Sequence, residues 1–273
     1  MKIKFATWNV NSIRSRMPRL LEWLKESKPD IIAIQELKCT NEQFPSEEIE
    51  DLGYNIAING QKTYNGVAIL SKFPLEDVIK KLPMYGEEGE DNNARYIEAV
   101  VSLDNKAIRV ASVYVPNGGS ELINGQKIED TPKFIHKINF YERLRKRLKH
   151  NLKNNEIGLL GGDFNTCPEL IDMYDIKQDG EICRNINERK KIREYINLGY
   201  SDAFRVKYPD VQQFTWWGFR NKGWQTGRGM RLDYILSTPL ATDKLVSCKI
   251  EDEETRGKER PSDHAPVVCI LDI

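Results

Sequence analysis

Residues 157–168, IGLLGGDFNTCP, are the stretch that decides the fold expected for this chain. Their apolar start predicts a buried strand that stops at two glycines, because core strands are short apolar runs bounded by turn residues. Asp163 and Asn165 follow on a tight loop, the kind of segment on which α/β and sandwich enzymes carry catalytic side chains. Taken alone, the two residues are better explained as a turn cap, which is common for Asp and Asn.

Length, composition and charge fit one enzyme-sized domain. The 273 residues can bury a full core, and no repeat, low-complexity tract or linker interrupts them, so residues 1–273 are expected to form a single domain. Lys+Arg and Asp+Glu both number 41, and this net charge of zero weighs against indiscriminate binding to polyanions. A local basic face is still compatible with that balance.

Cysteine usage and hydropathy give an expectation for location. The five cysteines have no metal-type spacing, so we expect free thiols in a reducing compartment. The N-terminal segment begins a strand at once, without the apolar core of a secretory signal, and no apolar stretch approaches membrane-spanning length. We therefore expect a cytoplasmic monomer without membrane contact.

Hydrophobic periodicity predicts helices and strands along the whole chain. Helices are expected over residues 15–28, Pro132–Leu152 and Ile186–Leu198, and the basic residues of the second helix, among them Arg143 and Arg147, are expected on a solvated face. An acidic, glycine-rich solvated loop is expected at residues 86–93. The predicted strands cover residues 2–8, 31–34, 54–59, 67–70, 95–103, 107–115, 157–160, 214–217, 230–236 and 265–271.

Polar clusters follow or precede several of these strands, and packed sheets would bring them to one rim. The clusters supply four carboxylates, Glu36, Asp163, Asp233 and Asp263. Carboxylates gathered in a low dielectric repel one another, so such a set persists when a divalent cation neutralises it. Oxygen-rich ligands with few histidines and no cysteine favour Mg²⁺ or Mn²⁺ over zinc.

Of the three histidines in the chain, His264 is the one expected to carry chemistry. It follows Asp263, and with Asp233 in reach it has the character of a base or proton carrier held by a carboxylate. His136 and His150 are expected to be ordinary structural residues.

Eight short motifs, taken in order, resemble the exonuclease III family of abasic-site (AP) endonucleases, within the endonuclease/exonuclease/phosphatase superfamily. Gly-Asp-x-Asn and Ser-Asp-His are shared across that superfamily, whereas Glu-Leu-Lys, Tyr-Val-Pro-Asn and Arg-Leu-Asp narrow the resemblance to exonuclease III. The motifs span essentially the whole chain: WNVNS (8–12), IQELK (34–38), YNGVA (64–68), ARYIE (94–98), YVPNG (114–118), GDFN (162–165), RLDY (231–234) and SDHAP (262–266).

The resemblance implies both a fold and an activity. The fold is a four-layer α/β sandwich, in which two packed, mostly antiparallel sheets are flanked by helices. The activity is Mg²⁺-dependent hydrolysis of the phosphodiester on the 5′ side of an abasic site in duplex DNA, with Mn²⁺ as a substitute ion. Related activities are 3′→5′ exonuclease action at 3′ ends and removal of 3′-blocking phosphates.

The resemblance also implies which side chains hold the metal. Glu36 is the main ligand, and Asn9 and Asp263 are either nearby ligands or residues that position the ligands. The full candidate metal set is Asn9, Glu36, Asp163, Asn165, Asp263 and His264.

The catalytic roles follow in the same way. Asp163 activates the attacking water, Asn165 stabilises the charge that develops at phosphorus, and Tyr114 contacts the scissile phosphate or helps the leaving oxygen. Asp233 orients His264, which binds and polarises the phosphate. In-line attack on a diester needs these functions: an activated water, charge neutralisation and leaving-group stabilisation.

Substrate contacts are expected in the loops around the same rim. Trp216 and Leu232 are expected to line an apolar slot for a flipped-out abasic sugar, whereas Phe214 is as readily explained by core packing. Met230 stands where some relatives carry Trp, and its flexible thioether is expected beside the same slot, where it could still wedge into the duplex. Further contacts to DNA are expected from Arg95, Asn117 and Arg231.

Two alternatives stay open. The first is a phosphoesterase of the same superfamily that acts on another substrate, such as RNA or an inositol phosphate. The second is a catalytically inactive relative that only binds nucleic acid. A degenerate metal set would favour the second alternative, and here that set is complete.

Overall fold

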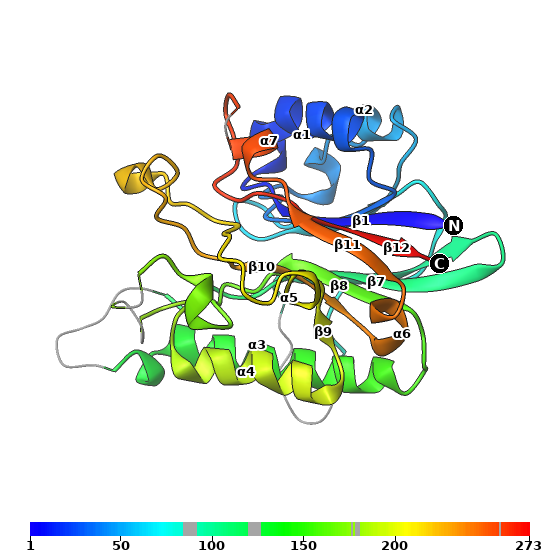
Figure 1. Ribbon diagram of the computed structural model, residues 1–273. Coiled ribbons are helices and arrows are strands. Elements are labelled where there is room, and N and C mark those ends of the chain that lie inside the picture. Colours follow the sequence, from blue (N-terminus) through cyan, green and yellow to red (C-terminus); the bar gives the residue numbers. More distant parts are fainter. Residues whose placement is uncertain (84–91, 120–126, 176, 178–180, 257) are drawn as a thin grey trace.

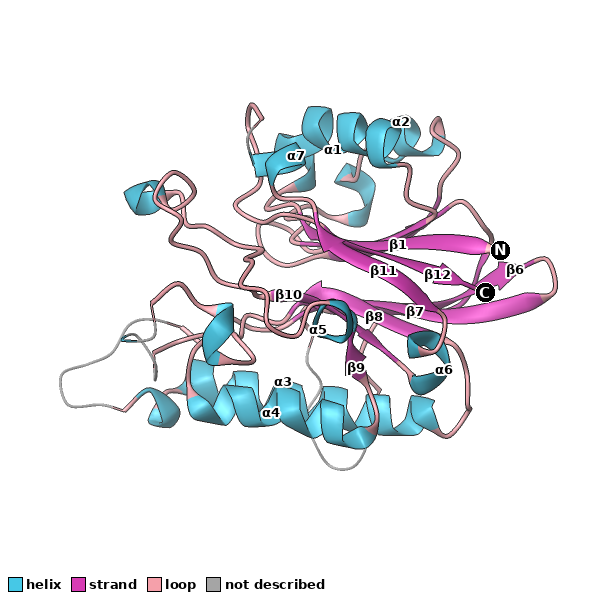
Figure 2. Ribbon diagram, in the orientation of Figure 1, coloured by secondary structure: helices cyan, strands magenta, loops and turns pink. Residues whose placement is uncertain are grey.

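The computed structural model describes residues 1–273 with the exception of 84–91, 120–126, 176, 178–180 and 257. Two six-stranded sheets pack face to face, and helices cover the outer face of each (Figures 1 and 2). This is the α/β sandwich that the motifs predicted. None of the helices in the described ranges is long and apolar enough to cross a membrane.

The first sheet contains strands from both ends of the chain. All neighbouring strands run antiparallel except β1 and β2, which are parallel. Its strands, in spatial order, are β11 (Leu245–Ile250), β12 (Val267–Asp272), β1 (Lys2–Asn9), β2 (Ile31–Gln35), β4 (Val67–Ser71) and β3 (Asn55–Asn59).

The second sheet is built from the middle of the chain. Its one parallel pair is β7 with β8, and the other neighbours are antiparallel, so both sheets are mostly antiparallel as expected. Its strands, in spatial order, are β5 (Leu75–Ile79), β6 (Tyr96–Leu103), β7 (Lys106–Tyr114), β8 (Gly158–Asp163), β10 (Asp233–Ser237) and β9 (Ser201–Asp202).

Helices form the two outer layers (Figure 1). On the outside of the first sheet lie α1 (Ile13–Ser27), α2 (Ser46–Glu50) and α7 (Glu253–Arg256), and on the outside of the second lie α3 (Pro132–Leu152) and α4 (Ile186–Leu198). The sequence signals for α3 and α4 are strong: Pro132 opens α3 at its first turn, and α4 begins with an Asn185–Glu188 capping box. Among the described residues, the remaining short elements are α5 (Ala203–Lys207), α6 (Pro239–Thr242) and the 3₁₀ turns Asn41–Gln43, Ile128–Asp130, Leu170–Asp172 and Arg220–Lys222.

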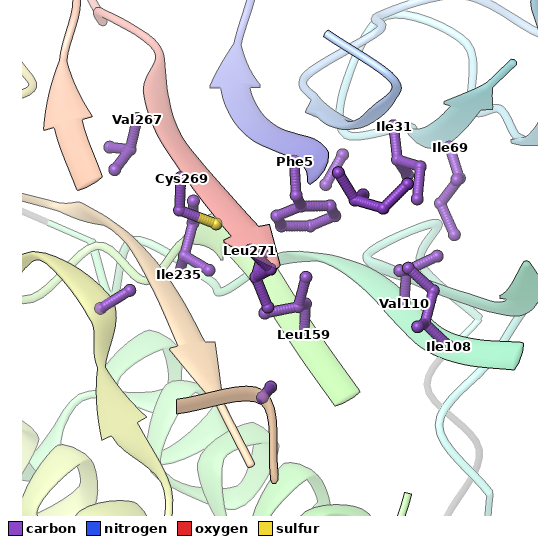
Figure 3. Packing of buried hydrophobic residues seen from close by; sticks show 14 of the residues in the cluster. Phe5, Ile31, Ile69, Ile108, Val110, Leu159, Ile235, Val267, Cys269 and Leu271 are labelled. Atoms are coloured by element: carbon purple, nitrogen blue, oxygen red, sulfur yellow. The ribbon is translucent and has the colours of Figure 1, made fainter. Parts of the chain in front are cut away.

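The space between the sheets is an apolar core. Figure 3 shows side chains of the first sheet, such as Phe5 and Ile31, facing Val110, Leu159 and Ile235 of the second. All five are almost completely excluded from solvent. Burial of this kind contributes on the order of 2 kcal/mol for each large side chain, so the facing sheets hold the strand ends in a fixed relation.

The two glycines of the opening stretch allow close approaches next to the strand ends, Gly161 to the facing sheet and Gly162 to the neighbouring strand β7. A Cβ atom on Gly161 would lie 2.7 Å from the Cβ of Thr7, and one on Gly162 would lie 2.2 Å from the carbonyl oxygen of Val113. A larger residue at either position would push β8 away from its neighbours. Gly161 therefore allows the end of β8, with Asp163, to lie against the end of β1, with Asn9.

Several predicted boundaries need correction. Residues 214–217 do not form a strand; Trp216 makes only isolated bridges, to Met230 and His264. Strand β10 begins at Asp233 rather than at 230, since the preceding residues bend into the cleft wall. Strands β5 and β11 were not predicted, because both lie at sheet edges and alternate with exposed polar residues.

The basic face expected on the helix 132–152 is only partly solvated. The bounds of α3 agree with the prediction, but Arg143 and Arg147 are buried, and Arg147 binds the fully buried Glu98 of β6. The stem of Arg147 packs as an apolar group while Glu98 neutralises its guanidinium group, and the Arg143 guanidinium lies over the Phe140 ring. Most of the acidic loop expected at residues 86–93 lies outside the described residues.

Candidate active site

Strand ends from both sheets meet at one rim, where they line a cleft of about 1070 Å³. Parallel pairing sets Asn9 opposite Gln35 and Tyr114 opposite Asp163, and the antiparallel strand β10 sets Asp233 opposite Asp163. The polar clusters that follow these strands in the sequence therefore converge. Side chains on the cleft wall include Glu36, Tyr114, Asn117, Asp163, Asn165, Trp216, Met230, Leu232, Asp263 and His264.

A chain of hydrogen bonds fixes the acidic centre of the cleft. The Asn9 amide donates to Glu36 Oε1 and to Asp163 Oδ2, both at 2.9 Å. The Lys38 ammonium lies 2.7 Å from Glu36 Oε2. Burial alone would raise the pKa of Glu36, but Lys38 and Asn9 hold that pKa below its usual value. Glu36 is therefore an ionised acceptor at neutral pH.

The backbone at Glu36 is held in a conformation that few residues adopt. Its φ angle is 57°, in the left-handed region. The Glu36 carbonyl accepts from the Ser12 amide at 2.8 Å, and the next amide, of Leu37, donates to the carbonyl of Gly66 at 3.1 Å. The motifs at 8–12 and 64–68 thus share one task, which is to aim the Glu36 carboxylate into the cleft.

The donor set of the cleft fits a hard divalent cation. One ligand atom each from Glu36, Asp163 and His264 lies within 4.8 Å of the others, a spacing that one ion can bridge. Asp263 stands just behind, where its carboxylate accepts from the Asn11 amide at 2.7 Å and from the Trp216 indole at 3.1 Å. The two carboxylates supply the oxygen ligands that Mg²⁺ and Mn²⁺ prefer, and this group of three residues contains no thiol.

Asp163 and His264 form a buried pair that shares protons. Burial, together with the charges of Asp233 and Glu36, raises the pKa of Asp163 to about 7 against the lowering effect of His264. Burial lowers the pKa of His264, but Asp233 and Asp163 outweigh it and raise that pKa to about 10. His264 Nε2 lies 3.7 Å from Asp163 Oδ2, and Nδ1 lies 2.8 Å from Asp233 Oδ2. The arrangement keeps a proton on the imidazole and leaves Asp163 poised near neutral pH.

Replacement of Asp233 tests this electrostatic arrangement. In the metal-free protein, Asp233→Asn removes the charge that faces Nδ1, so we expect the pKa of His264 to fall by at least one unit from about 10. The measurement is an NMR titration of the imidazole nitrogens, in which the signals of the exposed His150 serve as an internal control. A His264 titration that is the same in both proteins would contradict the assignment of Asp233 as its orienting charge.

Asn165 and Tyr114 complete the polar wall. The Asn165 backbone amide donates to Asp163 Oδ1 at 2.8 Å, and its side-chain amide donates to the Val115 carbonyl at 2.9 Å. Asn117 in turn donates to Asn165 Oδ1 at 3.2 Å. Burial next to Glu36 and Asp163 raises the pKa of the Tyr114 phenol, so this group is a neutral hydrogen-bond donor. All the predicted catalytic residues therefore meet in one place.

An apolar part of the cleft wall lies beside this polar wall. It is formed by Trp216, Met230, Leu232 and Cys183, which line the cleft and pack together in one cluster. Phe214 does not reach the slot; it packs against the main core between the sheets, which settles the alternative that the sequence left open. Met230 is only 8% exposed and is bridged to Trp216, so it lies within the cleft wall rather than projecting as a wedge.

Of the two predicted DNA-contacting arginines, only one faces the cleft side. Arg95 is partly exposed, and its guanidinium stacks on the Tyr114 ring at 4.9 Å from the centroid. Arg231 is 1% exposed, and it binds Asp172 at 2.6 Å and Asp202 at 2.7 Å in the interior. The expectation that Arg231 contacts DNA is therefore wrong, because its charge is neutralised within the protein.

Replacement of Arg231 should affect stability rather than substrate contact. Arg231→Met would remove the cation that Asp172 and Asp202 share, and their negative charge in the interior would be less well neutralised. We therefore expect a loss of about 3 kcal/mol in the free energy of unfolding. Urea denaturation followed by circular dichroism measures this loss. A variant as stable as the original protein, with weakened DNA binding, would restore the surface role for Arg231.

Sequence reasoning gave no role to two lysines at the site. Lys38 lies within the quoted motif 34–38, and its contact with Glu36 needed only the loop geometry to be seen. Lys137 gave a weaker signal: it falls on the apolar face of α3, in helical register with Phe134, Tyr141 and Leu144. A charged residue on such a face indicates a buried partner.

With this geometry in hand, the chain can be compared with known proteins. Residues 6–264 match the model of the Endonuclease/Exonuclease/phosphatase family. The chain is 32% identical to exodeoxyribonuclease III of Haemophilus influenzae, over 97% of this chain and 98% of that protein. It is 28% identical to an exodeoxyribonuclease of Bacillus subtilis, over 99% of this chain and 100% of that protein.

Solved structures give the same picture. A 3′ phosphatase from Neisseria bound to a product DNA hairpin superposes with a TM-score of 0.89 at 34% identity, covering 99% of this chain and 100% of that chain. An AP endonuclease from Archaeoglobus fulgidus also gives a TM-score of 0.89, at 33% identity and with the same coverage. The similarity therefore extends over the whole fold, including the rim that carries the cleft.

Proposed function

Because the chain belongs to the endonuclease/exonuclease/phosphatase family, we propose that it is a DNA-repair nuclease of the exonuclease III type. The preferred reaction is hydrolysis of the phosphodiester on the 5′ side of an abasic site, with 3′→5′ exonuclease and 3′-phosphatase action at 3′ ends. The observation that carries the proposal is the set of Glu36, Asp163, Asn165 and His264 in one cleft with an apolar wall, together with Asp233 bound to His264.

We propose Mg²⁺ as the cofactor, with Mn²⁺ as a substitute. Glu36 would be the main ligand, and Asn9, Asp163, Asn165 and Asp263 would hold or surround the ion. His264, which keeps its proton, would lie beside the ion without binding it. When bound, the ion neutralises charge on the phosphate oxygens. Because Lys38 contacts Glu36 Oε2 at 2.7 Å, a ligand role for that oxygen requires the ammonium group to move aside.

The side chains of the cleft supply the remaining steps of an in-line displacement. Ionised Asp163, whose pKa of about 7 suits a base at physiological pH, accepts a proton from the attacking water. The Asn165 amide and protonated His264 donate to the non-bridging oxygens as charge develops there. The neutral Tyr114 phenol donates to the phosphate or to the leaving 3′ oxygen. Asp233 keeps Nε2 of His264 directed at the substrate.

Substrate recognition follows from the slot and the rim. The apolar walls formed by Trp216, Met230 and Leu232 suit a deoxyribose without a base, which offers no edge for hydrogen bonding. Arg95 and Asn117 are placed to contact the DNA backbone. We further propose that residues 1–273 act as one domain and as a monomer; pairing of β1 with β12 joins the two ends of the described chain in one sheet.

A substrate panel tests the proposal against its alternatives. Three DNA duplexes carry a single abasic site, no lesion or a 3′-terminal phosphate. The alternative substrates are a matched RNA duplex and an inositol polyphosphate. We expect hydrolysis of the abasic and 3′-phosphate duplexes at rates at least about 100-fold above those for RNA or inositol phosphate. Faster hydrolysis of the RNA duplex or of the inositol polyphosphate would assign the protein to another branch of the superfamily. DNA binding without any hydrolysis would indicate an inactive relative.

A further inference from the structure

Lys137, on helix α3, lies directly beneath the two loops that carry the polar wall of the cleft. Its side chain and that of Glu188 on α4 are both completely buried, and they form an ion pair. The ammonium group donates to Glu188, to the Asn165 carbonyl at 2.6 Å and to the Asn117 carbonyl at 3.2 Å. A lysine has three donors, so every one of them is used.

Burial of this ion pair costs free energy, so a contribution to the stability of the fold does not by itself explain why a lysine lies here. Removing two ions from water costs several kcal/mol each, and well-packed apolar residues at such positions are often equally or more stabilising. The neighbours of Lys137 on the same face of α3, such as Phe134 and Tyr141, are apolar or aromatic. Lysine at this position is better explained by what its three donors hold in place.

Two of the three acceptors belong to residues of the cleft. The Asn165 backbone has a φ angle of 49°, in the left-handed region, and the residue after Asn117, Gly118, has a φ angle of 96°. Each loop thus turns sharply where Lys137 binds its carbonyl. The side chains above are interlocked, since Asn117 donates to Asn165 Oδ1 and Asn165 donates to the Val115 carbonyl.

Glu188 ties this arrangement to the rest of the outer layer. Its second carboxylate oxygen accepts from the Asn185 amide at 3.0 Å, as part of the box that begins α4. The Asn185 side chain donates to Glu129, on the cleft wall, at 2.8 Å. The stem of Lys137 also packs against the Asn117 loop, because a Cβ on Gly118 would lie 3.1 Å from Lys137 Cδ.

We propose that Lys137 is a positioning residue: its ammonium group locks the Asn117 and Asn165 loops together, and so fixes the position of the Asn165 side chain in the polar wall beside the reacting phosphate. Lys137 itself does not touch the substrate. The catalytic part of this inference rests on the function proposed above, whereas the locking of the loops is a property of the protein alone.

The test compares two buried ion pairs on the same helix. Lys137→Met removes the three donors with little change in length, and Arg147→Met removes one of the two arginines that pair with buried Glu98, at the far end of α3, away from the cleft. Both variants remove a cation from a buried carboxylate, so both are expected to lose stability, and Glu98 keeps Arg109 at 2.9 Å. Activity is measured at a temperature at which circular dichroism shows each variant to be folded, with a single-abasic duplex and Mg²⁺.

We expect Lys137→Met to lower kcat on the order of 100-fold while the KM for DNA changes less than about threefold. Arg147→Met should keep the original kcat. Lys137→Arg, which retains donors, should recover part of the loss. A kcat for folded Lys137→Met within about threefold of that of Arg147→Met would overturn the positioning role.

A second readout does not depend on turnover. The side-chain amide signals of Asn117 and Asn165 in ¹⁵N NMR spectra should shift or broaden in Lys137→Met and stay unchanged in Arg147→Met. Unchanged signals in both variants would overturn the locking of the loops. If the original protein cleaves none of the DNA substrates, the proposed function fails, and the NMR comparison still decides whether Lys137 holds the loops.

Discussion

Asp163→Asn should lower the turnover of an abasic duplex by about 10²- to 10⁴-fold, the range expected when a general base is removed. The amide keeps the shape of the side chain but cannot accept the proton of the attacking water. Binding of the duplex, measured by fluorescence anisotropy with Ca²⁺ in place of Mg²⁺, should change little. The loss would therefore lie in kcat rather than in KM.

The same substitution should not weaken the fold, and this separates a chemical effect from unfolding. Burial raises the pKa of Asp163 from 3.8 to about 7, so its favourable contribution to stability belongs to the protonated form and is lost as the pH rises through 7. At pH 8 the ionised carboxylate is a cost, which the neutral amide avoids. Thermal unfolding at pH 8 should thus occur no earlier than in the original protein.

The exposed Asp210→Asn provides the matched control, with activity and stability unchanged. If Asp163→Asn retains more than about a tenth of the turnover, another group activates the water.

Glu36→Ala should raise the Mg²⁺ concentration needed for half-maximal activity by at least tenfold and lower the maximal rate, because the ion loses the carboxylate that anchors it. The substitution also removes the carboxylate that Lys38 contacts at 2.7 Å, and with it a negative charge at the centre of the cleft. Calorimetric titration with Mn²⁺ should show a parallel loss of affinity without DNA. These two readouts distinguish a metal ligand from a residue that only contacts substrate.

Glu48→Ala, a change to an exposed carboxylate on α2, is the control for Glu36→Ala. Mn²⁺ affinity and Mg²⁺ requirement should both equal those of the original protein in that control. If Glu36→Ala behaves in the same way, Glu36 does not belong to the metal site.

The sequence was most informative where residue type and spacing determine local structure. Glycines at 161 and 162, next to an apolar run, predicted both the buried strand and the loop that follows it, since only glycine permits the close approach to Thr7 and Val113. The motifs identified the family, and the family match over residues 6–264 confirms that resemblance. The convergence of the polar clusters follows from strand direction: the parallel pairs β1–β2 and β7–β8 end at the same rim.

Other features depend on tertiary contacts that periodicity does not encode. Arg231 has the same residue type as a DNA-contacting arginine, and only the buried partners Asp172 and Asp202 show that its charge is used inside. Lys137 was similarly hidden, because a lysine on a helix is most often solvated. Edge strands such as β5 and β11 carry mixed polar patterns, so their pairing becomes evident only in the folded sheets.

The most direct test of the account follows cleavage of an end-labelled duplex that carries one abasic-site analogue, with Mg²⁺ and with EDTA. We predict a Mg²⁺-dependent cut on the 5′ side of the analogue, absent with EDTA and strongly reduced in Asp163→Asn. Shorter products below that band would report the 3′→5′ exonuclease share. Absence of the cut from folded protein supplied with Mg²⁺, or an equal cut in EDTA, would contradict the assignment of the cleft as a metal-assisted AP endonuclease site.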